Sequence, residues 1–135
     1  KALAKELEIE DSVVWTGYMS DEELVKTYQQ ADVLAHASRY EGFGLQVMEA
    51  MACGIPVVCS DAGSLPEVTG DAAILLKPDD TKAFAGRIQE VLTNQGLWTA
   101  MSKKGIARAA QYTWKRTAQD TLAVYEELNP DAAIS

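Results

Sequence analysis

The sequence predicts an α/β fold with a Rossmann-like, doubly wound parallel sheet. Three observations support this prediction. The chain has 135 residues, enough for one domain with a core of its own. Short runs of β-branched and apolar residues recur along it, namely Val13–Thr16, Val33–Ala37, Ile55–Cys59 and Ala73–Leu76. Longer segments with helical periodicity separate these runs, and such alternation favours a parallel sheet covered by helices.

The first part of the chain contains two expected helices around one expected strand. Residues 1–7 have weak helical character, and strand 13–16 follows with Trp15 expected in the core. Ser20 and Glu23 form a capping-box pattern, in which each side chain binds the backbone N–H of the other residue. We therefore expect a helix from Ser20 to about Gln30.

The middle of the chain reads as strand, loop, helix, strand and turn. After the strand Val33–Ala37, residues 38–43 are expected to form a loop. The helix Leu45–Ala52 should end near Gly54, because glycine adopts the left-handed conformation that commonly follows a helix. Residues 61–66 are rich in turn formers.

The last third of the chain is expected to be helical. Asp80 or Thr81 should cap the first helix. Residues 97–111 should form the second helix, and Thr113 should cap the third. Apolar residues share one face of the third helix, which predicts a packing stripe. These residues are Trp114, Ala118, Leu122, Tyr125 and Leu128. We assign residues 1–128 to a partial domain and residues 129–135 to a tail.

Charge and composition exclude several function classes. The net charge of −8 argues against binding to nucleic acid, which needs a surplus of Lys and Arg, and against an anionic membrane surface. No apolar run is long enough for a membrane span, and no signal peptide is visible. Two cysteines, Cys53 and Cys59, are too few for a disulfide framework and suggest buried thiols in a cytoplasmic protein.

Glu41 and Glu49 are the most informative pair, with seven residues between them in the run E-G-F-G-L-Q-V-M-E. Gly42 and Gly44 allow the backbone to approach a ligand, and a helix starting near Gly44 would offer N–H groups to a phosphate. Glu49 would lie about 6 Å along that helix. A nucleotide-sugar fits this arrangement, although a solvated loop acid and a surface helix residue remain alternatives for the two carboxylates.

This run resembles the E-x7-E motif of the retaining group 1 glycosyltransferases (family four), which have the GT-B fold. Other segments resemble family landmarks in the same order along nearly the whole chain. They are V-V-W-T-G-Y-M-S-D-E-E-L-V-K-T-Y-Q-Q-A-D from residue 13, M-A-C-G-I-P-V-V from residue 51, S-L-P-E-V from residue 64 and Y-T-W-K-R from residue 112. The resemblance implies that the chain is the C-terminal, donor-binding half of such an enzyme.

The resemblance also implies roles for individual residues. Glu41 would be the catalytic carboxylate at the donor sugar, and Glu49 would hold the ribose hydroxyls. Backbone N–H groups near the helix start would bind the diphosphate. The other donor-binding candidates are Gly42, Phe43, Gly44, Leu45, Gly17, Tyr18 and Ser38, and for Gly17 and Tyr18 an ordinary turn is the alternative.

Several parts of a complete enzyme are expected to lie outside this sequence. In the family, a basic G-R-…-K-G loop and the acceptor-binding N-terminal domain precede the region resembled here. We therefore expect this chain alone to be inactive, and any membrane contact to belong to the absent part. No metal or other cofactor is expected; the donor itself is the substrate. A GT-B-like nucleotide-sugar epimerase and a non-catalytic nucleotide-sugar-binding module are the alternatives.

Some residues deviate from the family pattern or have simpler explanations. His36, the single histidine, is expected to be a satisfied core residue. Gln46 and Ala37 stand where the family often has proline. Ser64 stands where a second glycine is common, and it is expected to narrow the approach of the backbone at that loop.

Overall fold

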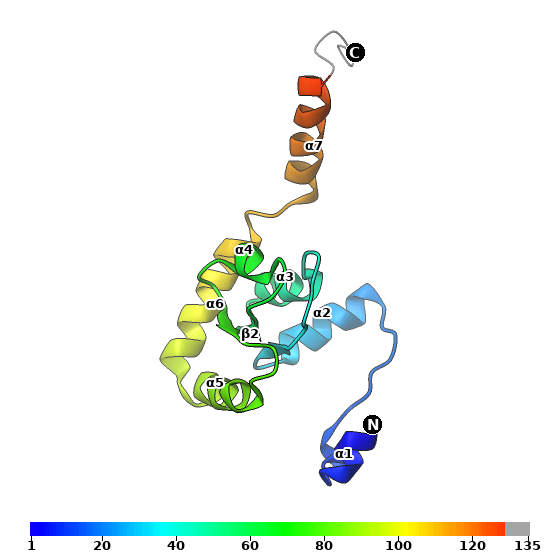
Figure 1. The fold of residues 1–135 in the computed structure, drawn as a ribbon, viewed down its shortest axis with the longest axis vertical. Coiled ribbons are helices and arrows are strands. Elements are labelled where there is room, and N and C mark those ends of the chain that lie inside the picture. The colour runs from blue at the N-terminus through cyan, green and yellow to red at the C-terminus, as the bar shows by residue number, and fades with distance from the viewer. Residues whose placement is uncertain (129–135) are drawn as a thin grey trace.

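The computed structural model describes residues 1–128 and contains a three-stranded parallel sheet (Figure 1). The strands β1 (Leu34–His36), β2 (Val57–Ser60) and β3 (Ile74–Leu76) lie in the order β1-β2-β3. Val57 pairs with Leu34 of β1, and Val58 pairs with Ile74 of β3. The predicted parallel sheet is thus confirmed. The expected tail, 129–135, lies outside the described residues.

Helices surround the sheet and continue beyond it at both ends of the chain. They are α1 (Ala2–Glu6), the 3-10 turn η1 (Glu10–Ser12), α2 (Asp21–Gln30), α3 (Leu45–Ala52), α4 (Leu65–Thr69), α5 (Thr81–Thr93), α6 (Gln95–Ala109) and α7 (Trp114–Leu128). Figure 1 shows α2 to α6 gathered around the strands, whereas α1 and α7 extend away from them.

The central strand β2 is fully buried and sends side chains to two separate cores. Val57 and Cys59 belong to a core shared with Met51 of α3, whereas Val58 belongs to one shared with Phe84 of α5. Successive side chains of a strand point to opposite faces. The sheet is therefore covered by helices on both faces, as a doubly wound fold requires.

Local capping signals position the helices as predicted. Glu23 accepts a hydrogen bond from the Ser20 N–H at 2.8 Å, and the Ser20 hydroxyl accepts one from the Glu23 N–H at 3.4 Å. Asp80 caps α5 by accepting from the Ala83 N–H at 2.9 Å. Gly54 follows α3 with φ of +77°, the left-handed conformation expected of a glycine at this position.

The strand predicted at residues 13–16 does not form. This segment is extended but pairs with none of the described strands, and Val14 is 85% exposed. A strand needs a neighbour for its backbone hydrogen bonds, so local β propensity alone does not produce one. Trp15 is correspondingly exposed rather than in the core, with the Lys1 ammonium 5.8 Å from its ring centroid.

The helix predicted after Thr113 forms, but its apolar face does not pack. Thr113 caps α7 by accepting from the Arg116 N–H at 3.1 Å. Trp114 is 83% exposed, and the other large residues of the stripe are exposed too, because no described element lies against this face. Helical periodicity correctly predicted the helix, but the inference that this face would be buried was wrong for residues 1–128.

The segment predicted as a turn at residues 61–66 contains the start of a short helix. The helix α4 begins at Leu65, with a proline in its first turn. Proline is well suited to the first turn of a helix, because the N–H that it lacks has no intrahelical partner there. Leu65 is fully buried, so the short helix also contributes to the core.

Candidate functional site

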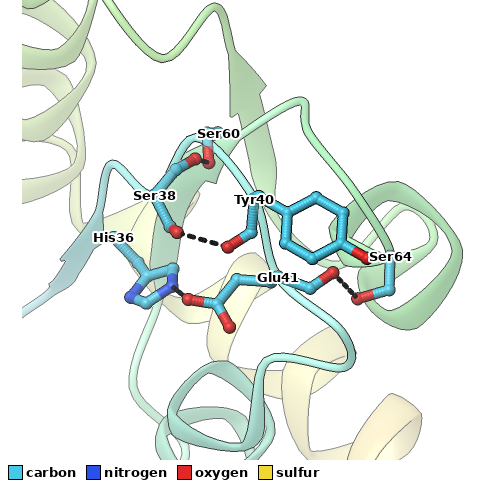
Figure 2. A network of polar contacts seen from close by, with 6 residues as sticks. All are labelled: His36, Ser38, Tyr40, Glu41, Ser60 and Ser64. Atoms are coloured by element: carbon cyan, nitrogen blue, oxygen red, sulfur yellow. Dashed lines mark hydrogen bonds and ion pairs between the residues drawn. The ribbon is translucent and has the colours of Figure 1, made fainter.

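The segments that follow the three strands meet at one edge of the sheet. The Ser60 hydroxyl at the end of β2 donates to the backbone carbonyl of Ser38, just after β1 (Figure 2). Arg39 donates to Asp79, which follows β3, from Nε at 3.1 Å and Nη2 at 2.8 Å. This edge lies beyond the carboxyl ends of parallel strands, where ligands of open α/β sheets bind.

The backbone of Glu41 is held by the loop after β2. The Ser64 N–H and hydroxyl donate to the Glu41 carbonyl at 3.2 and 3.1 Å. Gly63 has φ of +57°, and a Cβ there would lie 2.5 Å from the Glu41 carbonyl oxygen. Ser64 was expected to restrict how closely the backbone of its loop can approach, because the family commonly has glycine there. The structure shows that its side chain also adds a hydrogen bond to the Glu41 carbonyl.

The side chain of Glu41 faces His36, the last residue of β1. Glu41 Oε1 lies 3.0 Å from His36 Nε2, and their side chains are 26% and 18% exposed. A carboxylate in its ionised form only accepts hydrogen bonds, and the Nε2–H tautomer of His36 supplies the matching donor. His36 is thus satisfied by a hydrogen bond, as expected, but the partner is the candidate catalytic carboxylate, which the sequence did not reveal.

Ser38 contributes to the same loop through both its side chain and its backbone. Its hydroxyl donates to the Tyr40 carbonyl at 2.9 Å, while its own carbonyl accepts from Ser60 (Figure 2). The Ser38 hydroxyl can still accept a hydrogen bond from a ligand. In the described structure, however, its visible effect is to order the loop that leads to Glu41.

The helix α3 begins immediately after the loop, at Leu45, with Gly44 as its N-cap. Gly44 has φ of +91°, and a Cβ there would lie 2.5 Å from Leu65 Cδ2. No side chain caps this end, and the first N–H groups of a helix have no intrahelical partners. The N-terminal end of α3 therefore combines unpaired backbone N–H groups with the positive end of the helix dipole.

Glu49 lies further along α3 and contacts a residue of the core. The Tyr28 hydroxyl of α2 donates to Glu49 Oε2 at 3.2 Å. Tyr28 is only 9% exposed, and burial together with the Glu49 charge raises the pKa of its hydroxyl to about 12. Sequence reasoning missed Tyr28 because it lies on the apolar face of its helix, and only its position opposite Glu49 reveals the second role.

Two further candidates, Gly42 and Phe43, lie in the loop between Glu41 and α3 but differ in their surroundings. Gly42 is exposed, with open space where a Cβ would stand, so its backbone is accessible. The Phe43 ring makes an edge contact with Tyr112, with centroids 5.7 Å apart. It thereby lines a cavity of about 610 Å³ that does not include Glu41 or Glu49. The cavity is lined by Phe43, Arg108, Gln111, Tyr112, Thr113, Arg116, Thr117, Asp120, Thr121 and Val124.

Gly17 and Tyr18 lie in the segment before α2. Gly17 has φ of +65°, and the Tyr18 side chain is almost fully exposed. Within residues 1–128, neither of them makes a hydrogen bond to the loop 37–44. Within residues 1–128, the structure therefore does not link these two candidates to the Glu41 loop through hydrogen bonds.

Positive charge and metal ligands are scarce around Glu41. Arg39, the one cation that the sequence places near it, is paired with Asp79. Among residues 1–128, no group of three or more His, Cys, Asp or Glu side chains could hold a metal ion. No helix in that range is long and apolar enough to cross a membrane.

A family model matches most of the chain. The model of the family "Glycosyl transferases group 1" matches residues 1–108, most of the chain. The chain belongs to the group 1 glycosyltransferases. Its α/β fold with a parallel sheet is also that of the GT-B glycosyltransferases found among its structural neighbours.

Curated relatives of this group 1 chain transfer sugars. It is 40% identical over 114 residues to the O-antigen chain mannosyltransferase B of Escherichia coli, covering 84% of the chain and 30% of that protein. It is 38% identical over 131 residues to the D-inositol 3-phosphate glycosyltransferase of Mycolicibacterium smegmatis, covering 96% of the chain and 30% of the relative. The chain thus spans less than a third of the length of these relatives.

Solved structures resemble the group 1 chain over almost its full length. The sucrose-phosphate synthase of Thermosynechococcus elongatus matches with a TM-score of 0.86 and 33% identity, over 94% of the chain and 33% of that protein. The Anabaena protein HepE, solved in complex with UDP and glucose, matches with a TM-score of 0.82 and 26% identity, over 93% and 35% of the two chains.

Proposed function

We propose that this chain is the donor-binding part of a two-domain enzyme that transfers a sugar from a nucleotide-sugar to an acceptor hydroxyl with retention of configuration. One observation carries the proposal. The Glu41 carboxylate lies at the carboxyl edge of the sheet, next to the uncapped start of α3, and Glu49 follows on the same helix. Two carboxylates on either side of an anion-binding helix end suit a ligand with hydroxyls around a diphosphate.

Each part of the donor has a matching protein group in this proposal. Glu41 accepts hydrogen bonds from the sugar or stabilises positive charge near its reacting carbon. Backbone N–H groups of residues 42–45 bind the diphosphate, and Glu49 accepts from the ribose hydroxyls. Gly42 supports this arrangement, because its exposed backbone leaves room for close approach.

The phosphates need more positive charge than this chain provides. Its net charge is −8, and Arg39 is already paired with Asp79. We propose that Lys or Arg residues elsewhere in the complete enzyme supply the remainder, since its relatives are about three times longer. The acceptor then binds in the second domain, and this chain alone transfers no sugar; transfer by the chain alone would contradict that part of the proposal.

Catalysis in this proposal depends on positioning the donor and stabilising its leaving group. The bond between the sugar and the diphosphate breaks. Backbone N–H groups aimed at the phosphate oxygens stabilise the negative charge that develops there. The acceptor attacks from the face that the diphosphate leaves, so the configuration is retained and the leaving phosphate takes the acceptor proton. We expect no metal requirement, so a chelator should leave the rate unchanged.

The donor class is inferred from relatives together with the site. HepE was solved with UDP and glucose, and several relatives are named as mannosyltransferases. We therefore propose a nucleotide-activated hexose as donor and expect transfer in the cytoplasm, where the two cysteines would remain the free thiols seen here. The epimerase alternative is not favoured, because the relatives named here are transferases and synthases.

The test uses the complete enzyme and two donors, UDP-glucose and GDP-mannose. We expect one of them to bind with a micromolar to millimolar dissociation constant and to be consumed when acceptors are added. NMR of the new glycosidic bond should show the anomeric configuration of the donor. Binding without consumption would favour a non-catalytic module, and an inverted product would contradict retention.

A further inference from the structure

We propose that His36 is a positioning residue that sets the orientation of the Glu41 carboxylate toward the donor sugar. This inference rests on the proposed function for the role of Glu41, but the contact itself is a property of the chain. Glu41 Oε1 and His36 Nε2 are 3.0 Å apart, and the two residues lie on different elements, the loop and the end of β1.

The backbone around Glu41 is already fixed without His36. The Glu41 carbonyl accepts two hydrogen bonds from Ser64, and Gly63 packs directly against the Glu41 backbone. Ser38 and Ser60 order the preceding part of the loop. What remains free is the Glu41 side chain, whose rotatable bonds would otherwise let the carboxylate sample several orientations.

The contact with His36 removes this freedom and leaves one oxygen available. Figure 2 shows one oxygen of the carboxylate directed at the imidazole and the other directed away from it. The His36 side chain is only 18% exposed, so most of the ring surface is covered by protein. The second oxygen can then accept from a donor hydroxyl while the first stays bound to His36.

Arg39 is two residues from Glu41 in the sequence but pairs with a different carboxylate. It binds Asp79 through Nε and Nη2, and both of these side chains are largely exposed. His36 is therefore the side chain that the structure pairs with Glu41.

The first experiment compares two substitutions of His36 in the complete enzyme. His36→Leu removes the hydrogen-bond donor to Glu41, whereas the side-chain amide nitrogen in His36→Gln can replace Nε2 as that donor. We expect His36→Leu to lower kcat about tenfold, as loss of a hydrogen bond to a charged group predicts. The dissociation constant for UDP or GDP, whichever the wild type binds, should change less than about twofold, because other groups bind the diphosphate and ribose.

The glutamine variant should recover most of the lost kcat, which a purely structural role of the imidazole would not produce. Thermal melting of both variants checks that they fold. Equal loss of kcat in the two folded variants, or an unchanged kcat in His36→Leu, would overturn the proposal.

The second experiment needs no catalysis. In the complete enzyme, the ring ¹⁵N NMR signals of His36 are those that disappear in His36→Gln, and His36 is the single histidine of the chain described here. At a pH where the ring is neutral, we expect the proton on Nε2, and we expect this preference to weaken in Glu41→Gln. A proton on Nδ1 would overturn the contact. A complete enzyme that moves no sugar would refute the proposed function, and this spectrum would still decide whether His36 holds Glu41.

Discussion

The Tyr28 hydroxyl donates a hydrogen bond to Glu49 Oε2 across 3.2 Å, joining the buried face of α2 to the exposed carboxylate of α3. Tyr28 is otherwise part of the core beside Met48 and Leu24. One residue thus combines packing with positioning of a candidate ribose ligand. The contact restricts the Glu49 side chain before any ligand arrives, which reduces the entropy lost on binding.

Replacing Tyr28 with phenylalanine should weaken nucleotide binding with little effect on folding. The ring stays in the core, and Glu49 is exposed enough for water to replace the lost hydroxyl. We expect the dissociation constant of the complete enzyme for UDP to rise about fivefold, the equivalent of one net hydrogen bond. Isothermal titration measures this. Tyr125→Phe, at an exposed position on α7, is the matched control and should bind UDP normally.

Gly63→Ala should destabilise the protein although Gly63 is exposed. Alanine would require φ of +57° and would place Cβ 2.5 Å from the Glu41 carbonyl oxygen. We expect a loss of at least about 2 kcal/mol in the free energy of unfolding, from backbone strain and the forced movement of the loop. Gly86→Ala is the control. It lies in α5 with open space around it, so alanine should stabilise by up to about 1 kcal/mol. Urea denaturation distinguishes the two, and equal stability would contradict the loop geometry.

Two neighbouring aspartates should differ in their contribution to stability. Asp80 caps α5, so Asp80→Ala should cost about 1 kcal/mol. Asp79 pairs with Arg39 at the surface, and exposed pairs contribute little, so Asp79→Ala should cost less than about 0.5 kcal/mol. Thermal melting of the two variants under one condition gives the comparison. A larger loss for Asp79→Ala would show that the loop depends on the ion pair.

Cys59 should make stability depend on pH in the alkaline range. It is fully buried in β2, and burial, with a smaller effect of Asp61, raises the pKa of its thiol from 9.0 to about 12. The folded state therefore keeps its proton more tightly than the unfolded state. This contribution to stability is complete below pH 9 and falls as the pH rises from 9 to 12. Denaturation of Cys59→Ala across this range should show a shallower decline than wild type; an identical slope would contradict the prediction.

The sheet, α3 and the Glu41 loop were predictable from local patterns in the sequence. The strands 34–36 and 57–60 have strong apolar character, and the limits of α3 follow from Gly44 and Gly54, each with a positive φ in the structure. The capping box at Ser20 likewise depends only on residues three apart. Where residues close in the sequence determine the local structure, that structure could be predicted from the sequence.

The errors occurred where the outcome depends on which side chains or elements meet in the folded structure. Residues 13–16 have β propensity but no described strand beside them, and the apolar face of α7 has no described element opposite it. The contacts of His36 with Glu41 and of Tyr28 with Glu49 also join separate elements. Periodicity identifies apolar faces but does not reveal what the polar atoms of His36 and Tyr28 meet.

The affinity of the Glu49→Ala variant for nucleotide tests the central claim most directly. Isothermal titration of the complete enzyme with UDP or GDP, whichever the wild type binds, should show a loss of at least about tenfold, because the ribose hydroxyls lose a charged acceptor. Glu126→Ala, on α7, serves as the control and should bind as wild type does. An affinity unchanged by Glu49→Ala in a folded protein would contradict the assignment of the ribose and, with it, the proposed arrangement of the donor.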